Sequence, residues 1–337
     1  MQQNRILVTG GGGFLGKAIV KRLVDRGDEV FSFSRSFYPE LEIIGVKQIL
    51  GDIADAKAVE IACSGIDMVF HVAAKAGVSG KWIDYFKPNV IGTQNVADAC
   101  IKKGVKYLVH TSSPSVVFDG SNMEGVDESI PYPTTYHAPY PETKAMAEKI
   151  VINAASANSK VFSVVILRPH LIWGPEDNHL LPGIISRAKR LKRVGDGKNL
   201  VDTIYIDNAA HAHILAGDRL KSDKSISGNI YFISQDEPLP LWKMVDDMLD
   251  AAGLPPIKGS ISLKTAEIAG AAIETIFNLL KIKKEPPMTR FMAKELGTSH
   301  WFDISRVKRD LGYYPIVSTK EGLVRLKEWL NRTKKES

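Results

Sequence analysis

Cysteine is scarce in this 337-residue sequence, which contains only Cys63 and Cys100. Two cysteines cannot build the disulfide framework that stabilises small secreted domains. Residues 1–5 lead directly into an apolar run and lack the long hydrophobic segment of a secretory signal. We therefore expect a protein of the reducing cytoplasm.

The sequence also lacks internal repeats and low-complexity tracts. Its 44% hydrophobic and 24% charged residues are typical of a globular protein, and its length suits a large α/β domain with a smaller one attached. The formal net charge is +6, but Lys and Arg are interspersed with many acids. An anionic cofactor or substrate therefore explains the excess better than nucleic acid does.

The N-terminal region has the pattern of a dinucleotide-binding unit. Residues 5–9 form a short β-rich run, a glycine-rich turn follows, and a helical pattern covers residues 17–26. In such a unit Gly10 makes the turn, Gly13 lets the backbone approach a pyrophosphate, and Gly16 allows close helix packing. A bare glycine pattern also fits a structural turn, but the flanking strand and helix favour the nucleotide site.

The end of the second predicted strand, residues 29–33, lacks the acidic residue that usually holds the ribose 2′-hydroxyl of NAD. Arg35, between Ser34 and Ser36, can instead hold a 2′-phosphate through charge-assisted hydrogen bonds. The sequence therefore predicts NADP(H) as the cofactor. The alternative is that Arg35 is an ordinary solvated loop arginine.

Three further strands are predicted to end at the same edge of the sheet. Residues 47–50 lead to Asp52 and Ile53, residues 68–72 lead to Ala73 and Ala74, and residues 107–110 lead to Thr111, Ser112 and Ser113. Ligands of open α/β sheets lie beyond the carboxyl ends of the strands, so we expect a cofactor crevice here. A serine hydroxyl at this edge can hydrogen-bond a carbonyl oxygen that gains charge as hydride arrives, although such serines are also common turn formers.

Tyr140 and Lys144 lie four residues apart at a predicted helix start, which puts both on one side of the helix. Pro141 fits the first helical position and biases Tyr140 toward an extended, cap-like conformation. The positive end of the helix and the Lys144 ammonium would both lower the pKa of the phenol from about 10. The pair therefore indicates proton transfer during reduction or oxidation of a C–O bond, unless it is an accident of a surface helix.

Together these motifs resemble the extended short-chain dehydrogenase/reductase family over essentially the whole chain. The matching pieces are Thr9-Gly10-x-x-Gly13-x-x-Gly16, Asp52, Asn89-x-x-Gly92-Thr93-x-Asn95, Ser113, Tyr140-x-x-x-Lys144 and Leu167-Arg168-Pro169-x-x-Ile172-x-Gly174-Pro175. The resemblance implies an α/β fold, a Rossmann-type doubly wound parallel sheet with a smaller, interleaved substrate-binding domain. It places the NADP-binding domain in residues 1–175, with segments 202–210 and 229–233 returning to the main sheet. Residues 176–337 would form mainly the substrate-binding domain.

The resemblance also implies residue roles. Tyr140 would be the general acid/base, Lys144 would lower its pKa and bind the nicotinamide ribose, and Ser113 would position the substrate carbonyl. The implied cofactor contacts are Gly10, Gly13, Phe14, Leu15, Gly16, Ser34, Arg35, Asp52, Ile53, Ala73, Ala74, Tyr140, Lys144, Pro169 and Leu171. Candidate substrate contacts are Ser79, Trp82 and Trp173. No metal ligands are expected, because His211 and His213 fall on different faces of a helix.

The Ala138-Pro139-Tyr140-Pro141-x-Thr143-Lys144 run resembles the 3β-hydroxysteroid dehydrogenase branch. Residues 111–120, with 131–133 and 170–175, are similar to the bacterial 2-alkyl-3-oxoalkanoate reductases of long-chain olefin biosynthesis. This likeness implies an NADP-dependent oxidoreductase that reduces a long-chain 2-alkyl-3-oxoalkanoate to the 3-hydroxy acid. The alternatives are a 3β-hydroxysteroid or sterol dehydrogenase and a non-catalytic dinucleotide-binding sensor. Pro114 and Ser115 stand where related sugar-nucleotide dehydratases carry an Asp-Glu pair, which argues against dehydration. Ser34 stands where epimerases usually keep an acid, which makes an epimerase less expected.

Residues 261–282 form a predicted helix whose polar positions make one narrow stripe among apolar residues. The polar positions are Lys264, Glu267, Glu274, Asn278 and Lys281. These charges argue against a transmembrane span. Three interpretations stay open, a lid over an apolar substrate tunnel, an interfacial helix at the inner membrane surface, and a plain buried helix. The basic run 187–193 is expected to be a solvated helix face or a site for an anionic group. The resemblance further implies a homodimer through helices near 89–100 and 142–155.

Overall fold

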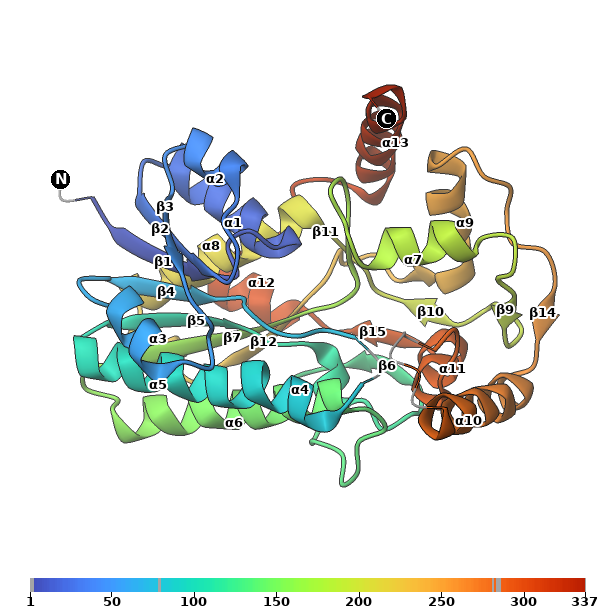
Figure 1. Cartoon of the computed structure of the whole chain (residues 1–337), viewed down its shortest axis with the longest axis horizontal. Coiled ribbons are helices and arrows are strands. Elements are labelled where there is room, and N and C mark those ends of the chain that lie inside the picture. The colour runs from blue at the N-terminus through green and yellow to red at the C-terminus, as the bar shows by residue number, and fades with distance from the viewer. Residues whose placement is uncertain (1–2, 78–79, 281, 283–285, 337) are drawn as a thin grey trace.

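The structure is a computed structural model that describes residues 3–77, 80–280, 282 and 286–336. Within these residues, seven parallel strands form the main sheet in the order β12-β7-β5-β4-β1-β2-β3 (Figure 1). The strands are β1 (Arg5–Thr9), β2 (Glu29–Ser34), β3 (Lys47–Leu50), β4 (Met68–His71), β5 (Tyr107–Thr111), β7 (Ser163–Pro169) and β12 (Ile230–Ile233). The chain builds outward from β1 in one direction and from β4 in the other. The switch between β1 and β4 is where a dinucleotide binds in such sheets.

Helices cover both faces of this sheet, as an all-parallel sheet requires. The helices α3 (Ala56–Ala62), α5 (Gly92–Lys103) and α6 (Pro139–Ala157) cover one face, and α1 (Phe14–Asp25) and α8 (Ile206–Ser222) cover the other (Figure 1). Successive strand residues point to opposite faces. Ile6 and Val8 accordingly pack in the core under α1 and α8, whereas Leu7 packs under α3, α5 and α6. The apolar runs of the central strands thus supply two cores at once.

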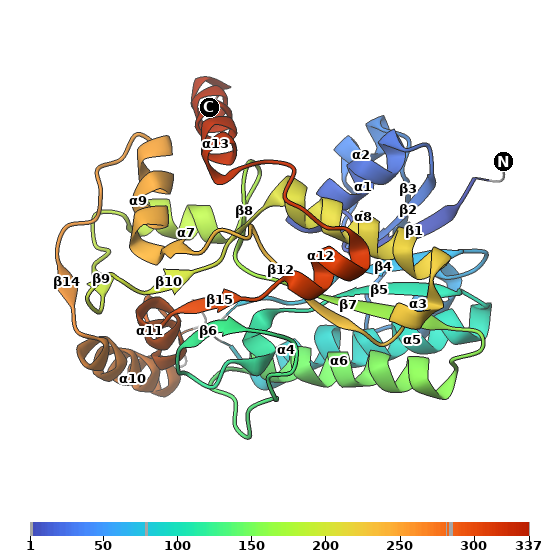
Figure 2. The same ribbon diagram turned by 180° about the vertical axis from the view of Figure 1, so that it is seen from behind.

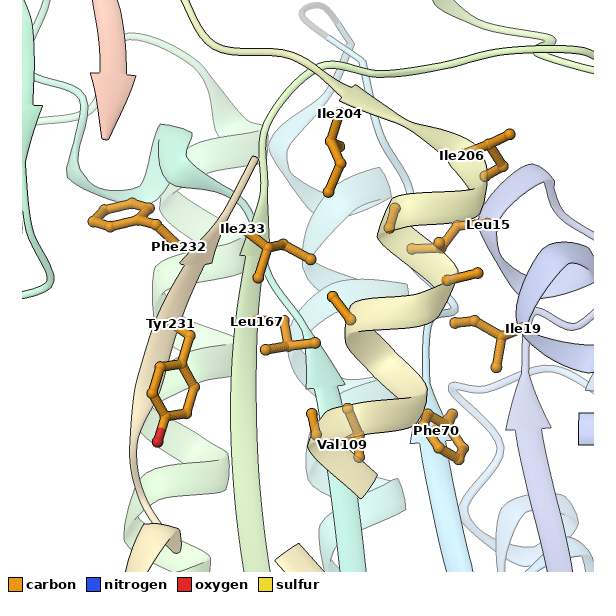
Figure 3. Close-up of a cluster of buried hydrophobic side chains, with 14 of the residues drawn as sticks. Leu15, Ile19, Phe70, Val109, Leu167, Ile204, Ile206, Tyr231, Phe232 and Ile233 are labelled. Atoms are coloured by element: carbon orange, nitrogen blue, oxygen red, sulfur yellow. The ribbon is translucent and has the colours of Figure 1, made fainter. Parts of the chain in front are cut away.

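Figure 3 shows how the core beneath α8 is filled. Leu15 and Ile19 of α1 point toward α8, while Phe70, Val109 and Leu167 come from neighbouring strands of the sheet. All five side chains are buried. Burial of this kind anchors the helix that begins immediately after the glycine-rich turn.

A smaller part of the chain lies beside the carboxyl ends of the main strands, to the right in Figure 1. It contains a four-stranded sheet in the order β13-β10-β15-β6 and the paired strands β9 with β14. The strands are β6 (Met123–Val126), β9 (Arg193–Val194), β10 (Leu200–Val201), β13 (Leu239–Pro240), β14 (Ser260–Ile261) and β15 (His300–Phe302). The helices are α7 (Leu180–Arg187), α9 (Leu241–Ala251), α10 (Leu263–Leu279) and α11 (Arg290–Gly297). Because β6 comes from the first half of the chain, the two parts are interleaved.

Other elements are α2 (Pro39–Ile43), α4 (Trp82–Phe86), the strand pair β8 (Ile172–Trp173) with β11 (Ile204–Tyr205), α12 (Ser305–Leu311) and α13 (Thr319–Glu336). Short helical segments also occur at Lys87–Ile91, Pro114–Val117 and Lys224–Ile226. Figure 2 shows α12 beside α8 on the back of the main sheet. Among the described residues, no helix has both the length and the apolar content to cross a bilayer.

The predicted α/β fold is confirmed, and the first five strands match within one residue at each end. Residues 230–233 return to the main sheet as expected, but residues 204–205 pair with β8 instead. The segment after them forms α8, which covers the sheet rather than extending it. Two helix starts also differ, because α1 begins at Phe14 and α6 begins at Pro139.

Candidate active site

The glycine-rich turn joins β1 to α1 at the switch point of the sheet. Gly10 adopts a φ of +71°, which favours glycine, and its carbonyl oxygen accepts a hydrogen bond from the Gly13 N–H at 2.9 Å. A Cβ at Gly16 would collide with the Gly10 carbonyl, so only glycine lets α1 approach this closely. The N-cap residue Gly13 has no side chain to cap α1, and the first N–H groups of the helix are therefore available to a bound pyrophosphate. The turn fits a dinucleotide.

Close packing also requires glycine at two further positions, and the sequence pattern does not reveal this requirement. A Cβ at Gly11 would meet the hydroxyl of Ser32, and one at Gly12 would overlap the ring of Tyr38. Tyr38 thus lies directly against the turn. Its signal in the sequence is weak, since it stands in a loop beyond the second predicted strand.

The proposed selector of the 2′-phosphate lies at the end of β2, close to this turn. The Ser34 hydroxyl donates to the Ser36 carbonyl oxygen at 2.8 Å, which closes the loop around Arg35. Arg35 is exposed, and within the described part of the chain its guanidinium has no hydrogen-bond or ion-pair partner. A guanidinium without a protein partner is free to receive a phosphate.

Residues beyond β3 and β4 complete the crevice. The Asp52 carboxylate accepts from the Ala54 N–H at 2.9 Å, and the Ile53 carbonyl accepts from the Asn95 side chain at 3.0 Å. Ala73 lies against Gly10, where a Cβ would come within 3.0 Å of the Ala73 backbone. The predicted cofactor residues from four strand ends are therefore brought together at one edge.

Tyr140, Lys144 and Ser113 meet beside this crevice. Tyr140 is half-buried in the first turn of α6, and the Ser113 hydroxyl is close enough to its phenol to lower the pKa of Tyr140. The buried Lys144 ammonium donates to the Thr111 carbonyl oxygen at 2.6 Å, at the end of β5. Ser113 is the N-cap of the short helical turn Pro114–Val117 after β5, and Ser113 and Ser115 share a hydroxyl contact of 2.9 Å.

The expected cap-like conformation of Tyr140 is wrong. Ala138 is the N-cap of α6, Pro139 is its first residue, and Tyr140 is already helical. Both Pro139 and Pro141 are tolerated because the first N–H groups of a helix have no partner within it. Tyr140 therefore projects from a rigid turn instead of an extended segment.

The expected lowering of the Tyr140 pKa is also not found. Burial raises the pKa of Tyr140 above its usual 10, the Ser113 hydrogen bond lowers it, and the Glu295 carboxylate raises it further. Burial lowers the pKa of Lys144 to about 8, against an opposing effect of Glu148. Sequence spacing placed the two side chains on one side of α6, but it could not show how strongly both are desolvated.

Asn89 ties the first turn of α6 to the loop after β4. Its side-chain oxygen accepts from the Lys75 N–H at 2.7 Å, and its side-chain nitrogen donates to the Lys75 carbonyl and to the Thr143 hydroxyl. The Thr143 hydroxyl in turn donates to the Pro139 carbonyl at 2.8 Å. Asn89 thus fixes the helix start from which Tyr140 projects.

Glu295 of α11 is a functional candidate that the sequence did not reveal. It acts electrostatically on the Tyr140 phenol, and burial raises its own pKa to about 7. Within the described residues its carboxylate has no hydrogen-bond or ion-pair partner. Its position, 155 residues from Tyr140 in the sequence, gives no local signal.

The residues after β7 lie at the same edge. Pro169 ends the strand and is buried, and Leu171 follows with a φ of +44°. A non-glycine residue in this region is strained, and such strain is concentrated at functional sites. The position of Leu171 is consistent with its predicted contact to the cofactor.

The candidate substrate residues have different fates. Ser79 lies outside the described residues. Trp82 is exposed on α4, donates to the Glu142 carboxylate at 2.9 Å and stacks on Phe86. Trp173 is fully buried, donates to the Thr203 hydroxyl at 3.1 Å and packs against Tyr205. Trp173 is therefore a core residue, which leaves it no exposed surface for a substrate.

His213 of α8 is buried, and its ring forms hydrogen bonds with the Ala209 carbonyl oxygen and the Thr111 hydroxyl. Since a carbonyl only accepts, Nδ1 carries the proton and the Thr111 hydroxyl donates to Nε2. His213 thus connects α8 to the end of β5, next to the strand end that Lys144 contacts.

Comparisons with solved structures agree with this architecture. An epimerase from Methanothermobacter thermautotrophicus superposes with a TM-score of 0.79 at 20% identity, covering 99% of this chain and 94% of that one. A dTDP-glucose 4,6-dehydratase from Streptomyces venezuelae superposes with a TM-score of 0.77 at 24% identity, with 98% of each chain covered. At these identities the likeness concerns the fold.

Sequence comparisons are more specific. The chain is 49% identical over 327 residues to a 2-alkyl-3-oxoalkanoate reductase of Stenotrophomonas maltophilia, covering 96% of this chain and 98% of the relative. It is 47% identical to a protein of the same name from Shewanella oneidensis, covering 95% and 84%. It is 32% identical to the human sterol-4-alpha-carboxylate 3-dehydrogenase, decarboxylating, covering 96% and 87%.

The family of the chain follows from its sequence and its site together. The site holds the residues of a nicotinamide-dinucleotide enzyme, and these relatives are reductases and dehydrogenases. The protein is thus an oxidoreductase of the short-chain dehydrogenase/reductase type. The sequence profile of the 3-beta hydroxysteroid dehydrogenase/isomerase family matches residues 7–264, and the chain belongs to this family.

Proposed function

We propose that the protein reduces a long-chain 2-alkyl-3-oxoalkanoate to the 3-hydroxy acid with NADPH. The observation that carries this proposal is the meeting of Ser113, Tyr140 and Lys144 beside the glycine-rich turn. The substrate class rests on the two bacterial reductases that are 49% and 47% identical. The preference for NADPH rests on Arg35, which has no partner among the described residues, and on Ser34 in place of an acid.

The reaction needs hydride at a carbonyl carbon and a proton at its oxygen, and bound NADPH supplies the hydride. The Ser113 hydroxyl orients the carbonyl oxygen, and the Tyr140 phenol donates the proton to it. Reduction requires a protonated phenol. Burial and Glu295 both raise the pKa of Tyr140, so the site favours the protonated form that reduction uses.

A second candidate function is oxidation of a sterol or steroid at the 3-position. The observation in its favour is the 32% identity to the human sterol-4-alpha-carboxylate 3-dehydrogenase over most of both chains. The names of the bacterial reductases and of the human dehydrogenase share one chemical feature. In both substrates a carboxylate is attached to the carbon next to the carbon that is oxidised or reduced, so a β-oxygenated acid is the common unit.

The two candidates are separated by kinetics on a substrate series. 2-Alkyl-3-oxo acids lose carbon dioxide spontaneously, so the stable 2-alkyl-3-hydroxy acids should be tested with NADP⁺, beside a 3β-hydroxysteroid carboxylate. Each methylene that enters an apolar site contributes about 0.8 kcal/mol, so kcat/KM should rise about fourfold per carbon until the site is full. A flat series together with rapid turnover of the steroid would refute the acyl substrate and establish the second candidate.

A further inference from the structure

Helix α10 presents several of its apolar side chains outward. Ile268, Ile276 and Leu279 are 62%, 50% and 76% exposed, and they lie on the same face as Ala272. In Figure 1, α10 lies at the outer corner of the smaller part of the molecule, with α11 on its inner side. A surface helix normally turns its apolar face to the core and its polar face to solvent.

The inner face of α10 is packed closely against α11 and includes an ion pair. Gly270 approaches the start of α11 so closely that a Cβ would come within 2.7 Å of the Thr289 backbone. The Glu274 carboxylate turns inward and accepts from the backbone N–H and the guanidinium of Arg290, both at 2.8 Å. Ala266, one turn before Gly270, is fully buried. The interpretation as a plain buried helix is therefore wrong for the outer half of α10.

The arrangement also argues against a lid formed by α10 itself. Glu295 on α11 acts on the Tyr140 phenol, and α10 packs on α11. Helix α11 thus lies between α10 and the catalytic edge, and Ile276 and Leu279 of α10 are exposed.

We propose that the outward face of α10 rests on an anionic lipid bilayer. Aliphatic side chains on successive turns of one helix face can enter the boundary between lipid headgroups and acyl chains. The helix would lie in the plane of the surface, with Ile268, Ala272, Ile276 and Leu279 directed into the bilayer.

The charge of the surrounding sequence selects an anionic surface as the occupant. Residues 179–200 contain six Lys or Arg and one acid, and residues 255–300 contain seven Lys or Arg and four acids. The combined positive charge of these two segments is larger than the net charge of +6 of the whole chain, so the rest of the sequence is slightly acidic. The parallel pairing of β9 with β14 joins the basic segment 187–193 to the start of α10. Basic residues beside an apolar face strengthen attachment to anionic lipids.

The same charges disfavour a second copy of the chain as the occupant. A symmetric dimer through α10 would bring two identical faces together. The basic segments beside them would then approach each other, and like charges across an interface oppose association. An anionic bilayer instead attracts both segments.

A cavity of about 460 Å³ connects this face to the neighbourhood of the catalytic helix. It is lined by Tyr136, His137, Glu267, Ile268, Ala271, Arg290 and Lys294. Ile268 belongs to the outward face of α10, and Tyr136 and His137 directly precede α6. The cavity thus begins beside the proposed bilayer contact and borders the segment that leads to Tyr140.

The test is co-sedimentation of the full chain with vesicles of phosphatidylcholine alone or mixed with phosphatidylglycerol. The wild type should bind the mixed vesicles, and added salt should weaken binding because it screens the basic residues. The variant I268S/I276S/L279S should bind the mixed vesicles with an affinity lower by roughly tenfold or more, since it loses the apolar contact. The matched control I43S/I61S/V161S changes exposed aliphatic side chains elsewhere and should bind like the wild type.

A gain-of-binding variant keeps the test independent of the stability of the triple variant. Ala272→Trp adds a residue that favours membrane interfaces to the exposed face and should increase binding several-fold. Failure of the wild type to bind mixed vesicles, or equal loss in the control, would overturn the proposal. So would a concentration-dependent dimer that the triple variant abolishes. Vesicle binding is measured without substrate and is therefore separate from the proposed reductase activity.

Discussion

Arg168 of β7 and Glu148 of α6 form a doubly hydrogen-bonded ion pair, with distances of 2.9 and 2.8 Å. Their side chains are 2% and 0% exposed. The Tyr132 hydroxyl also donates to the Glu148 carboxylate, at 2.6 Å. Since Glu148 lies one turn beyond Lys144, the pair fixes the catalytic helix against the main sheet.

Glu148→Gln should destabilise the protein by about 3–5 kcal/mol, because it leaves the Arg168 guanidinium buried without its counter-charge. It should also lower the pKa of Lys144 below about 8. In the wild type the Glu148 carboxylate raises this pKa and so opposes the effect of burial. Urea unfolding measures the first effect. Asp247→Asn, which removes the exposed ion pair with Lys243, is the control and should cost less than about 1 kcal/mol. Equal effects of the two substitutions would contradict the structural role of the buried pair.

Tyr140→Phe removes the phenolic proton without changing the bulk of the ring. Single-turnover reduction should slow by about 10²–10⁴-fold, whereas NADPH affinity, measured by fluorescence titration, should stay within about threefold. Lys144→Ala should harm both quantities, because Lys144 is expected to hold the nicotinamide ribose as well. The assignment of Tyr140 as proton donor fails if its variant keeps more than about a tenth of the wild-type rate.

Ser34→Asp combined with Arg35→Ala should invert the cofactor preference from NADPH to NADH. The double variant loses a charged contact to the 2′-phosphate and gains a like-charge repulsion, which together are worth about a hundredfold or more in kcat/KM. Arg35 is exposed and unpartnered within the described chain, so Arg35→Ala alone should leave thermal stability unchanged, whereas Ser34→Asp loses the hydrogen bond to the Ser36 carbonyl. Wild-type constants that are equal for the two cofactors would contradict the assignment.

The sequence predicted the sheet and its crevice because both depend on local patterns. Continuous apolar runs such as residues 68–71 predict strands that are buried on both faces. A glycine-rich turn between such a strand and a helix is typical of a nucleotide site. The parallel arrangement then brings Ser113 and Lys144 to one edge without further information. Local pattern and global fold agree in this half of the chain.

The sequence could not predict properties that depend on distant partners. Trp173 stands beside the motif after β7, but Tyr205 and Thr203 bury it. Glu274 belongs to the polar stripe that the sequence predicts for residues 261–282, yet only the position of α11 shows that its carboxylate faces inward. Glu295 likewise reaches Tyr140 through tertiary packing alone. Periodicity defines the faces of an element, whereas the neighbouring element decides which face is buried.

The last prediction concerns Glu295 and pH. Burial raises its pKa from 4.5 to about 7, so the folded protein binds a proton more tightly there than the unfolded chain does. Stability from this group is present below about pH 4.5 and is lost as pH rises to about 7. Glu295→Gln should therefore stabilise the protein at pH 8 by up to about 3 kcal/mol relative to its effect at pH 4.5.

The effect is measured as the difference in unfolding free energy between variant and wild type across pH. The difference cancels the contribution of Asp202, whose pKa burial also raises to about 7. Glu124→Gln, on the exposed side of β6, is the control and should give a flat difference. A flat difference for Glu295→Gln as well would show that its carboxylate is not desolvated in the folded protein.

The same substitution should alter catalysis in the oxidative direction, where Tyr140 acts as a phenolate base. Ionised Glu295 raises the pKa of Tyr140, so its removal should shift the rise of kcat/KM for the 3-hydroxy acid to lower pH. Reduction at neutral pH should change little, since the phenol stays protonated in both proteins. An unchanged pH profile for oxidation would separate Glu295 from Tyr140 and leave the carboxylate with a role in stability alone.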